Sequence, residues 1–179
     1  LPSLFAAHDR LASADPRRAR LAAPIAELRA WDRRSSVASV PTTLAVYWGE
    51  ELWKRARADP DAEGVDLYTF MATRTAPVAR LDALVSALEK LESDFGTWRT
   101  PWGEVNRFQR LTGDIVQPFA DSGASLPVGF TSSRWGSLAA FGAESYAGSK
   151  RLYGANGNSF VAVVEFGDRV VARAISAGG

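Results

Sequence analysis

Residues 156–179 of the chain, NGNSFVAVVEFGDRVVARAISAGG, predict two β-strands joined by a tight turn. The first strand alternates between two largely apolar faces, with Phe160, Ala162, Val164 and Phe166 on one and Val161, Val163 and Glu165 on the other. Gly167-Asp168 fits a two-residue type II′ turn, because glycine occupies its first position. The return strand, Val170 to Ile175, is apolar on both sides apart from Arg173. Such a strand pair is typical of a sheet covered on each face, so we expect further elements to pack on it.

Length and composition describe an ordinary globular chain without a marked charge. The sequence has 179 residues, 46% of them hydrophobic, which is enough for the core of one domain. The formal net charge of +1, from 21 basic and 20 acidic residues, gives no electrostatic basis for binding nucleic acid or an anionic membrane. The absence of cysteine excludes disulfides, thiolate metal ligands and a cysteine nucleophile. No apolar run approaches the roughly 18 residues of a membrane span.

Three helices are predicted before Trp98. The first begins at Asp15-Pro16, a cap followed by proline, and Pro24 is expected to kink it or to split it in two. The second covers Ser39 to Asp59 and ends at an Asp59-Pro60-Asp61 turn. The third begins near Pro77 and is stopped by Gly96. Its apolar stripe comprises Leu81, Leu84, Val85, Leu88, Leu91 and Phe95.

The chain from Trp98 onwards is rich in glycine, serine and aromatic residues, which predicts short strands and long loops. We therefore divide the sequence into a helical section, residues 1–97, and a loop-rich β section, residues 98–179, that ends in the strand hairpin. The fold class expected from this order is α+β. Since Leu1 is not an initiator and Gly179 follows a strand directly, we also expect the sequence to be part of a larger chain.

Several patterns that could carry chemistry have simpler structural explanations. His8 with Asp9 beside it is expected to be an ordinary surface residue rather than a base or a metal ligand, because adjacent residues of a helix do not face one another. The basic run Arg17-Arg18-Ala19-Arg20 is expected to be a solvated helix face. Gly154-Ala155-Asn156-Gly157 precedes a strand, the reverse of the order in a phosphate-binding loop, and is interpreted as a plain turn.

Carboxylates and tryptophans leave alternatives open. Glu50-Glu51, and Glu104 with Asp114, could be the paired carboxylates of a glycosidase, but sequence spacing does not show their separation in space. Trp31, Trp48 and Trp53 fall in predicted helices, where packing explains them. For the tryptophans in loop-like sequence, packing is again favoured, with the wall of a pocket as the alternative. These are Trp98, Trp102 and Trp135.

Four segments occur in an order that carries a family resemblance. They are residues 28–32, LRAWD; residues 47–52, YWGEEL; residues 98–108, WRTPWGEVNRF; and residues 157–179. Together they resemble the penicillin acylase family of N-terminal-nucleophile amidohydrolases, the first two its helical region and the last two the second half of its long β-chain. Family members carry a histidine where this chain has Asn106. After the final hairpin they continue into a glycine-serine-glycine, proline and histidine stretch.

The resemblance implies amide hydrolysis by a serine that is the first residue of a β-chain, with its own α-amino group as base. An asparagine side chain and backbone N–H groups would hold the oxyanion. Leu1 has no hydroxyl, and the asparagine and a nearby arginine of the family lie upstream of the region resembled. We therefore expect no catalytic, cofactor-binding or metal-binding residue in this chain, and the sequence does not identify its substrate-binding residues.

The resemblance also implies the setting of the chain. The final strands would belong to the central sheet of an αββα hydrolase, and the partners would be the α-chain and the N-terminal half of the β-chain of the same precursor. The substrate would be a small acyl amide: a β-lactam antibiotic side chain, an acyl-homoserine lactone of quorum signalling or a lipopeptide. The family location implied is the periplasm. The alternatives are a stand-alone α+β ligand-binding or interaction module, and a relative that has lost activity and serves as a scaffold.

Overall fold

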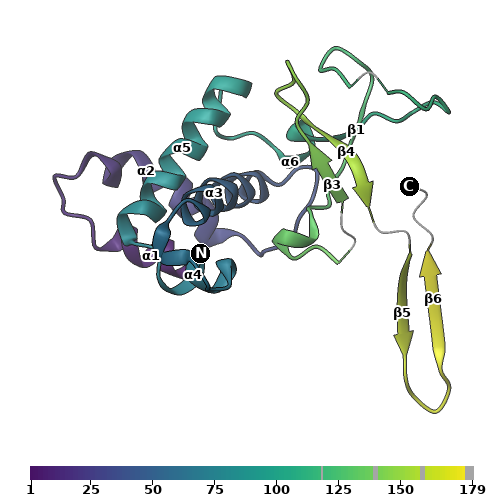
Figure 1. The fold of residues 1–179 in the computed structure, drawn as a ribbon, viewed down its shortest axis with the longest axis horizontal. Coiled ribbons are helices and arrows are strands. Elements are labelled where there is room, and N and C mark those ends of the chain that lie inside the picture. The colour runs from purple at the N-terminus through teal and green to yellow at the C-terminus, as the bar shows by residue number, and fades with distance from the viewer. Residues whose placement is uncertain (118, 139–140, 158–159, 176–179) are drawn as a thin grey trace. The chain divides into compact units, whose positions relative to one another are not determined.

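The computed structural model describes residues 1–117, 119–138, 141–157 and 160–175. The chain forms two compact units. The first, of helices, comprises Leu1–Arg34 and Ser39–Pro101; the second, which holds the strands, comprises Ser35–Ala38 and Trp102–Gly179. Figure 1 shows the helices of the first unit and the strands of the second along the chain. The α+β class, with N-terminal helices followed by mainly antiparallel strands, is confirmed.

The helical unit contains the three predicted helices and two shorter ones. Their bounds are α1 Pro2–Asp9, α2 Pro16–Ala30, α3 Val40–Arg57, α4 Leu67–Thr73 and α5 Pro77–Phe95, with a single 3-10 turn at Pro60–Ala62. Asp15 caps α2 by accepting from the Arg17 N–H, and Ser39 caps α3 by accepting from the Thr42 N–H. Gly96, at φ 79°, ends α5 in the left-handed conformation.

Pro24 lies inside α2 and is buried, yet the helix continues through it to Ala30. The alternative in which this proline splits the helix in two is therefore wrong. A proline costs a helix one backbone hydrogen bond and crowds the preceding turn. Here Leu21, Ile25 and Leu28 are buried around it. Their packing offsets that cost.

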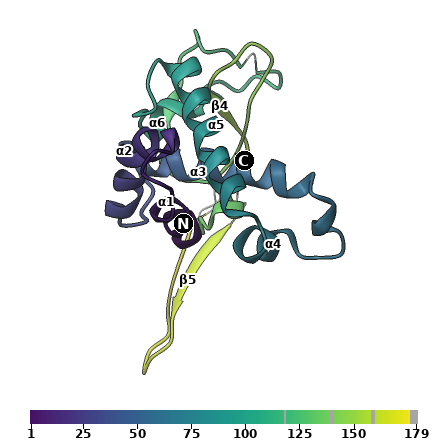
Figure 2. The ribbon, with the colours of Figure 1, turned by 90° about the vertical axis from the view of Figure 1, so that its left-hand side faces the viewer.

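The core of the helical unit lies between α3 and α5, which cross and pack against each other (Figure 1 and Figure 2). Leu84, Leu88 and Leu91 of α5 are fully buried, as the predicted apolar stripe requires. Trp48 of α3 is also buried, and its Nε1–H donates to the Arg80 carbonyl oxygen at 3.0 Å. This single hydrogen bond satisfies the polar atom of a large core side chain.

Arg80 joins α5 to the end of α4. Its Nη2 donates to the carbonyl oxygens of Met71 at 3.3 Å and Ala72 at 3.2 Å. A guanidinium at this point satisfies carbonyl groups that a helix C-terminus leaves unpaired. Burial lowers the pKa of Arg80, because little water reaches the charge.

The second unit contains a short helix and two small sheets. Its elements are α6 Trp102–Val105, β1 Asn106–Phe108, β2 Leu126–Pro127, the 3-10 turn Ser133–Trp135, β3 Phe141–Glu144, β4 Leu152–Gly157, β5 Val161–Glu165 and β6 Val171–Ile175. In the described residues the first sheet has the order β2-β1-β4-β3, and β5 and β6 form the second. The β1–β4 pair is parallel and the other pairs are antiparallel.

The glycine-rich stretch 154–157, interpreted as a turn, is part of strand β4, so that prediction is wrong. Across the sheet, the ring of Phe141 occupies the place where a Cβ on Gly154 would lie. Gly142 of β3 is in the same position: the side chain of Asn156, on β4, occupies the place where a Cβ on Gly142 would lie. The glycines serve close packing within a sheet, which the local pattern could not distinguish from turn formation.

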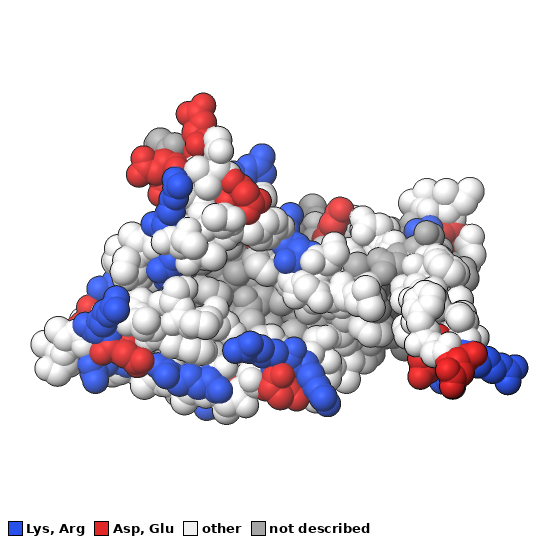
Figure 3. All heavy atoms as spheres, turned by 90° about the horizontal axis from the view of Figure 1, so that it is seen from below, with Lys and Arg blue, Asp and Glu red and all other residues white. Residues whose placement is uncertain are grey.

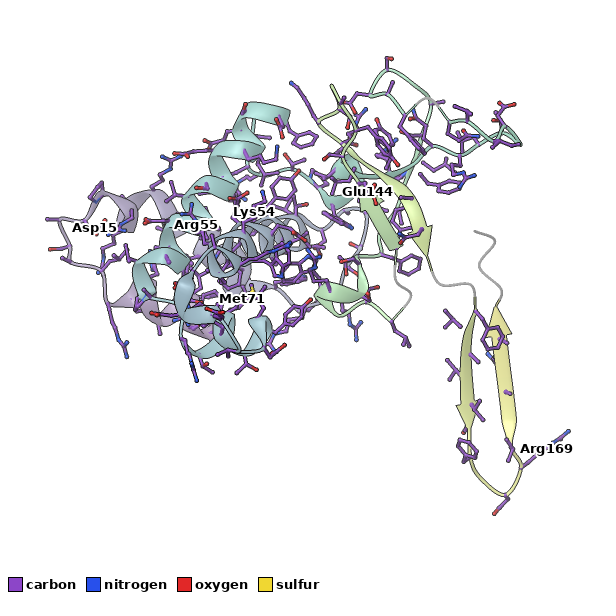
Figure 4. All side chains as sticks on the ribbon, viewed as in Figure 1. Asp15, Lys54, Arg55, Met71, Glu144 and Arg169 are labelled. Atoms are coloured by element: carbon purple, nitrogen blue, oxygen red, sulfur yellow. The ribbon has the colours of Figure 1, made fainter. Side chains whose placement is uncertain are left out.

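The final hairpin has the predicted strands but a different turn. Glu165 lies opposite Val171, whereas a two-residue turn at Gly167-Asp168 would place Phe166 opposite Arg169. The glycines with positive φ are Gly64, Gly96, Gly136 and Gly148. Gly167 therefore lacks the conformation that a type II′ turn requires, and the connection is one residue longer than predicted. Figure 4 shows Arg169 at the end of this hairpin.

Both faces of the β5–β6 hairpin are exposed in the described structure. Phe160 is 62% exposed, Val163 64% and Phe166 83%, although Val163 belongs to one face and the two phenylalanines to the other. The expectation that each face is covered is therefore not met by the described residues of this chain. A stable sheet with two apolar faces needs a cover on each.

Candidate functional site

The tryptophan-glycine segment that carries the resemblance builds the start of the second unit. Trp102 is buried, and its Nε1–H donates to the Phe130 carbonyl oxygen at 3.0 Å. The Gly103 N–H donates to the Val37 carbonyl oxygen at 2.8 Å. A Cβ on Gly103 would lie 2.9 Å from the Cβ atoms of Pro127 and Val37. Glycine is therefore required where three chain segments meet.

Asn106, which stands where the resemblance places a histidine, has a structural role. It is 1% exposed, and its Nδ2 donates to the carbonyl oxygens of Val128 at 3.1 Å and Phe130 at 2.8 Å. The backbone carbonyl oxygen of Asn106 accepts from the Val128 N–H at 2.9 Å. Both amide protons are thus used on backbone groups. We call Trp102, Asn106 and the Val128–Phe130 segment the loop clamp.

Arg107, the residue after Asn106, also holds backbone groups that are distant in the chain. Its Nε donates to the Ser125 hydroxyl at 3.0 Å, and its Nη2 donates to the Ser125 carbonyl oxygen at 2.7 Å. Its Nη1 donates to the Gly103 carbonyl oxygen at 2.8 Å. Each guanidinium nitrogen therefore donates one hydrogen bond within the protein, which joins the backbone before β1 to the backbone before β2.

A second polar network centres on Asp121. Its carboxylate accepts from the Lys150 N–H at 2.8 Å, the Arg151 N–H at 3.4 Å and the Tyr153 hydroxyl at 2.8 Å. The Arg151 guanidinium donates to the backbone carbonyl oxygen of Asp121 at 3.0 Å and forms an ion pair with Glu104 at 3.5 Å. These contacts fasten the start of β4 to the connection between β1 and β2 and to α6.

The same network changes the pKa of two groups. Burial alone would raise the pKa of Asp121, but the hydrogen bonds from Lys150, Tyr153 and Arg151 together lower it below its ordinary value. Burial, and then the hydrogen bond to Asp121, raise the pKa of Tyr153 to about 12. Phe119 stacks on Tyr153 and on Tyr146, which closes one side of the network with aromatic rings.

His8 is not the surface residue that was expected. Its side chain is 14% exposed, and its Nε2 lies 3.3 Å from the Arg18 carbonyl oxygen. Its Nδ1 lies 3.8 Å from the Asp9 carboxylate, which also receives two hydrogen bonds from Arg29. These contacts join α1 to α2.

The remaining candidate residues have local partners. The basic run pairs with acids instead of facing only solvent: Arg17 binds Asp15 and Asp82, and Arg20 lies near Glu89 and Glu92. On the face shown in Figure 3, acidic and basic side chains are likewise interspersed. This arrangement produces no field of one sign.

Members of the proposed glycosidase carboxylate pairs each interact with a neighbouring side chain. Glu51 pairs with Lys54 at 2.7 Å, and Asp114 accepts from the Thr112 hydroxyl at 2.7 Å. Lys54 is labelled on α3 in Figure 4. Within the described ranges, no group of three or more His, Cys, Asp or Glu side chains is placed to hold a metal ion. None of the helices described is long and apolar enough to cross a membrane.

The tryptophans differ in how deeply they are buried. Trp48 and Trp102 are buried with their N–H groups bonded, so packing explains both, including one from the loop-like sequence. Trp31 is half-buried and donates to the Arg34 carbonyl oxygen at 2.9 Å. Trp98 is half-buried and carries the Arg99 guanidinium 4.3 Å above its ring.

Sequence reasoning missed the Asp121 network and the loop clamp. Asp121 and Tyr153 are far apart in the chain, and neither stands in a motif with fixed spacing. Asn106 lies within a recognised segment, but its partners are backbone carbonyl groups of Val128 and Phe130, which have no sequence signature.

Comparison with known proteins gives one family. The family model described as penicillin amidase matches residues 1–179, the whole of the sequence. No curated protein matches the chain significantly. The family match agrees with the resemblance carried by the tryptophan-glycine segment and the final hairpin.

Proposed function

The chain belongs to the penicillin amidase family, and we propose that it is a structural portion of an amidohydrolase that releases an acyl group from an amine. The nucleophile would be an N-terminal serine of a β-chain. Both amide protons of Asn106, and one N–H on each guanidinium nitrogen of Arg107, donate to protein groups, which is consistent with a structural portion.

The observation that carries this proposal is the exposed final hairpin. Two strands with apolar side chains on both faces are unstable alone in water, and they match the pattern of an internal sheet. The α-chain and the N-terminal half of the β-chain of the same precursor would supply the cover. A self-contained ligand-binding module would instead bury these faces within the described chain, so the exposure argues against that alternative.

The substrate proposed is a small acyl amide: a β-lactam antibiotic side chain, an acyl-homoserine lactone or a lipopeptide. The proposed location is the periplasm, where such compounds enter from outside the cell. Antibiotic cleavage and quorum quenching are the two activities to compare first, because their substrates differ in the group attached to the amide nitrogen.

The test compares the 179-residue chain with the full-length gene product. We expect the pure chain to hydrolyse neither penicillin G nor acyl-homoserine lactones, and the full-length protein, after self-cleavage, to hydrolyse at least one of the three substrate classes. Amine release is measured by fluorescamine and chain cleavage by intact mass. Turnover by the 179-residue chain would overturn the proposal, as would an uncleaved, inactive full-length protein.

A further inference from the structure

The two exposed faces of the β5–β6 hairpin differ in their chemistry. Residues that lie directly opposite one another in antiparallel strands place their side chains on the same face of the sheet. The register of the hairpin and the alternation along β5 therefore define one face by Phe160, Ala162, Val164, Phe166, Ala172 and Ala174. None of these side chains is polar. We call this surface the phenylalanine face.

The opposite face carries two charges. Its described side chains are Val161, Val163, Glu165, Val171 and Arg173. Arg173 is exposed at the centre of β6, directly opposite Val163. Glu165 is exposed at the end of β5, next to the turn, and lies diagonally across the strands from Arg173. We call this surface the charged face.

The same cover cannot suit both faces. Covering the phenylalanine face removes only apolar side chains from water, which is favourable. Covering the charged face takes a guanidinium in the middle of a strand out of water, and burying a charge is costly unless it is paired and hydrogen-bonded. Glu165 differs from Arg173, because a side chain at the turn end of the hairpin can keep contact with water at the margin of a cover.

We propose that the remainder of the precursor covers the two faces unequally: an apolar layer packs on the phenylalanine face, and the segment on the charged face presents a carboxylate to Arg173. This inference rests on the proposed function, which assigns the cover of the hairpin to the precursor. A carboxylate matches a guanidinium in charge and in its bidentate geometry. Pairing with Glu165 alone would use at most two of the five guanidinium N–H groups, so the cover would still need an acceptor.

Two adjacent valines provide a matched test in the full-length, self-cleaved gene product. Val163→Thr and Val164→Thr keep a β-branched side chain of the same shape and add one hydroxyl, on opposite faces of β5. Val164→Thr should lower the melting temperature by about 4 °C, because its hydroxyl enters an apolar layer. Val163→Thr should lower it much less, because the carboxylate and Arg173 offer its hydroxyl partners. Equal shifts would overturn the proposal of unequal covers.

Arg173→Met tests for the carboxylate in the same protein. The variant keeps an apolar stem but leaves the carboxylate buried without its partner, so its melting temperature should fall below that of the wild type. Burial would raise the pKa of that carboxyl group, so the deficit should be large at about pH 8 and should shrink toward pH 5, where the carboxyl group binds a proton. Glu165→Gln is the control and should melt near the wild-type temperature.

Two results would overturn the carboxylate partner. Equal losses in Arg173→Met and Glu165→Gln would show that the two charges pair within the hairpin, and a loss independent of pH would show a packing role only. Amine release and chain cleavage, measured on the same proteins, keep this inference separate from the proposed function. An active, cleaved protein with equal threonine shifts would overturn only the inference. An uncleaved, inactive protein would overturn the proposed function, whereas its melting temperatures would still report on the covers.

Discussion

Single side chains in this protein act mainly by holding backbone that is distant in sequence. Asn106 holds two carbonyl groups of the Val128–Phe130 segment, and Trp102 donates to one of the same carbonyl oxygens. The Asp121 carboxylate holds the backbone N–H groups of Lys150 and Arg151 before β4, and it also accepts from the Tyr153 hydroxyl. The loss of these hydrogen bonds should therefore appear in stability.

Replacing Asn106 tests the loop clamp. Asn106→Leu keeps the approximate volume but leaves two buried carbonyl groups without donors, so it should cost about 2 kcal/mol of unfolding free energy. Asn106→Asp should cost more at neutral pH, since a carboxylate would face two carbonyl oxygens. Urea unfolding followed by tryptophan fluorescence measures both. Equal stability of Asn106→Leu and the wild-type protein would show that the clamp hydrogen bonds carry no net free energy.

The pKa of Tyr153 predicts an alkaline limit to stability. A folded-state pKa of about 12, above the ordinary value of 10.0, means that the folded state favours the neutral phenol. This contribution is fully present below pH 10 and is lost as the pH rises toward 12. Tyr153→Phe should cost about 1 kcal/mol at pH 7, and the difference from wild type should shrink above pH 10. A constant difference from pH 7 to pH 11.5 would contradict this assignment.

At the scale of elements, helix boundaries follow from local chemistry. The Ser39 hydroxyl accepts from the Thr42 N–H at 3.2 Å and from the Thr42 hydroxyl at 2.7 Å, which starts α3. Gly96 ends α5 with a positive φ. The short helices α1, α4 and α6 were not predicted, because a helix of one or two turns is held by its neighbours rather than by its own pattern. Arg80 at the end of α4 is one such neighbour contact.

Removing the cap of α3 should have a measurable cost. Ser39→Ala deletes the acceptor for the first turn of the helix and should lower the unfolding free energy by about 1 kcal/mol. Ser39→Asp provides an equivalent acceptor and is the matched control, expected to stay near wild-type stability. Circular dichroism at 222 nm during thermal unfolding provides the measurement. A cap role is ruled out if both variants melt at the wild-type temperature.

At the scale of the whole molecule, the chain forms two units and leaves its last hairpin without a cover in the described structure. The composition and the strand pattern indicated that such strands need neighbours, and the exposed fractions of Phe160 and Val163 agree with that need. The family membership assigns those neighbours, by proposal, to the rest of the precursor.

The exposed hairpin reverses one expectation about mutation. From the strand pattern, Phe160→Asp would bury an unpaired charge and destabilise the fold strongly. With Phe160 at 62% exposure, the dilute, monomeric 179-residue chain should lose less than about 0.5 kcal/mol. Leu84→Asp, in the fully buried core of α5, is the control and should prevent folding. In the full-length protein, Phe160→Asp should instead abolish assembly. A large loss in the monomer would indicate that this chain covers the strand itself.

Much of the architecture could be predicted from the residues. The three long helices, the short strands and the alternating faces of the final two strands depend on caps, apolar spacing and alternation, which act over a few neighbouring residues. The same locality explains the errors. The glycines of residues 154–157 were taken for a turn because their purpose, room for Phe141, lies across the sheet. The connection at Gly167 differs because strand register sets it.

By itself, then, the sequence determined the α+β class, the limits of the long helices and the family, since each is encoded by local pattern or by the order of segments. The tertiary structure alone decided which polar side chains matter. Asn106 with Phe130, and Asp121 with Tyr153, meet only after folding, because hydrogen-bond partners distant in the chain leave no mark on the spacing of residues.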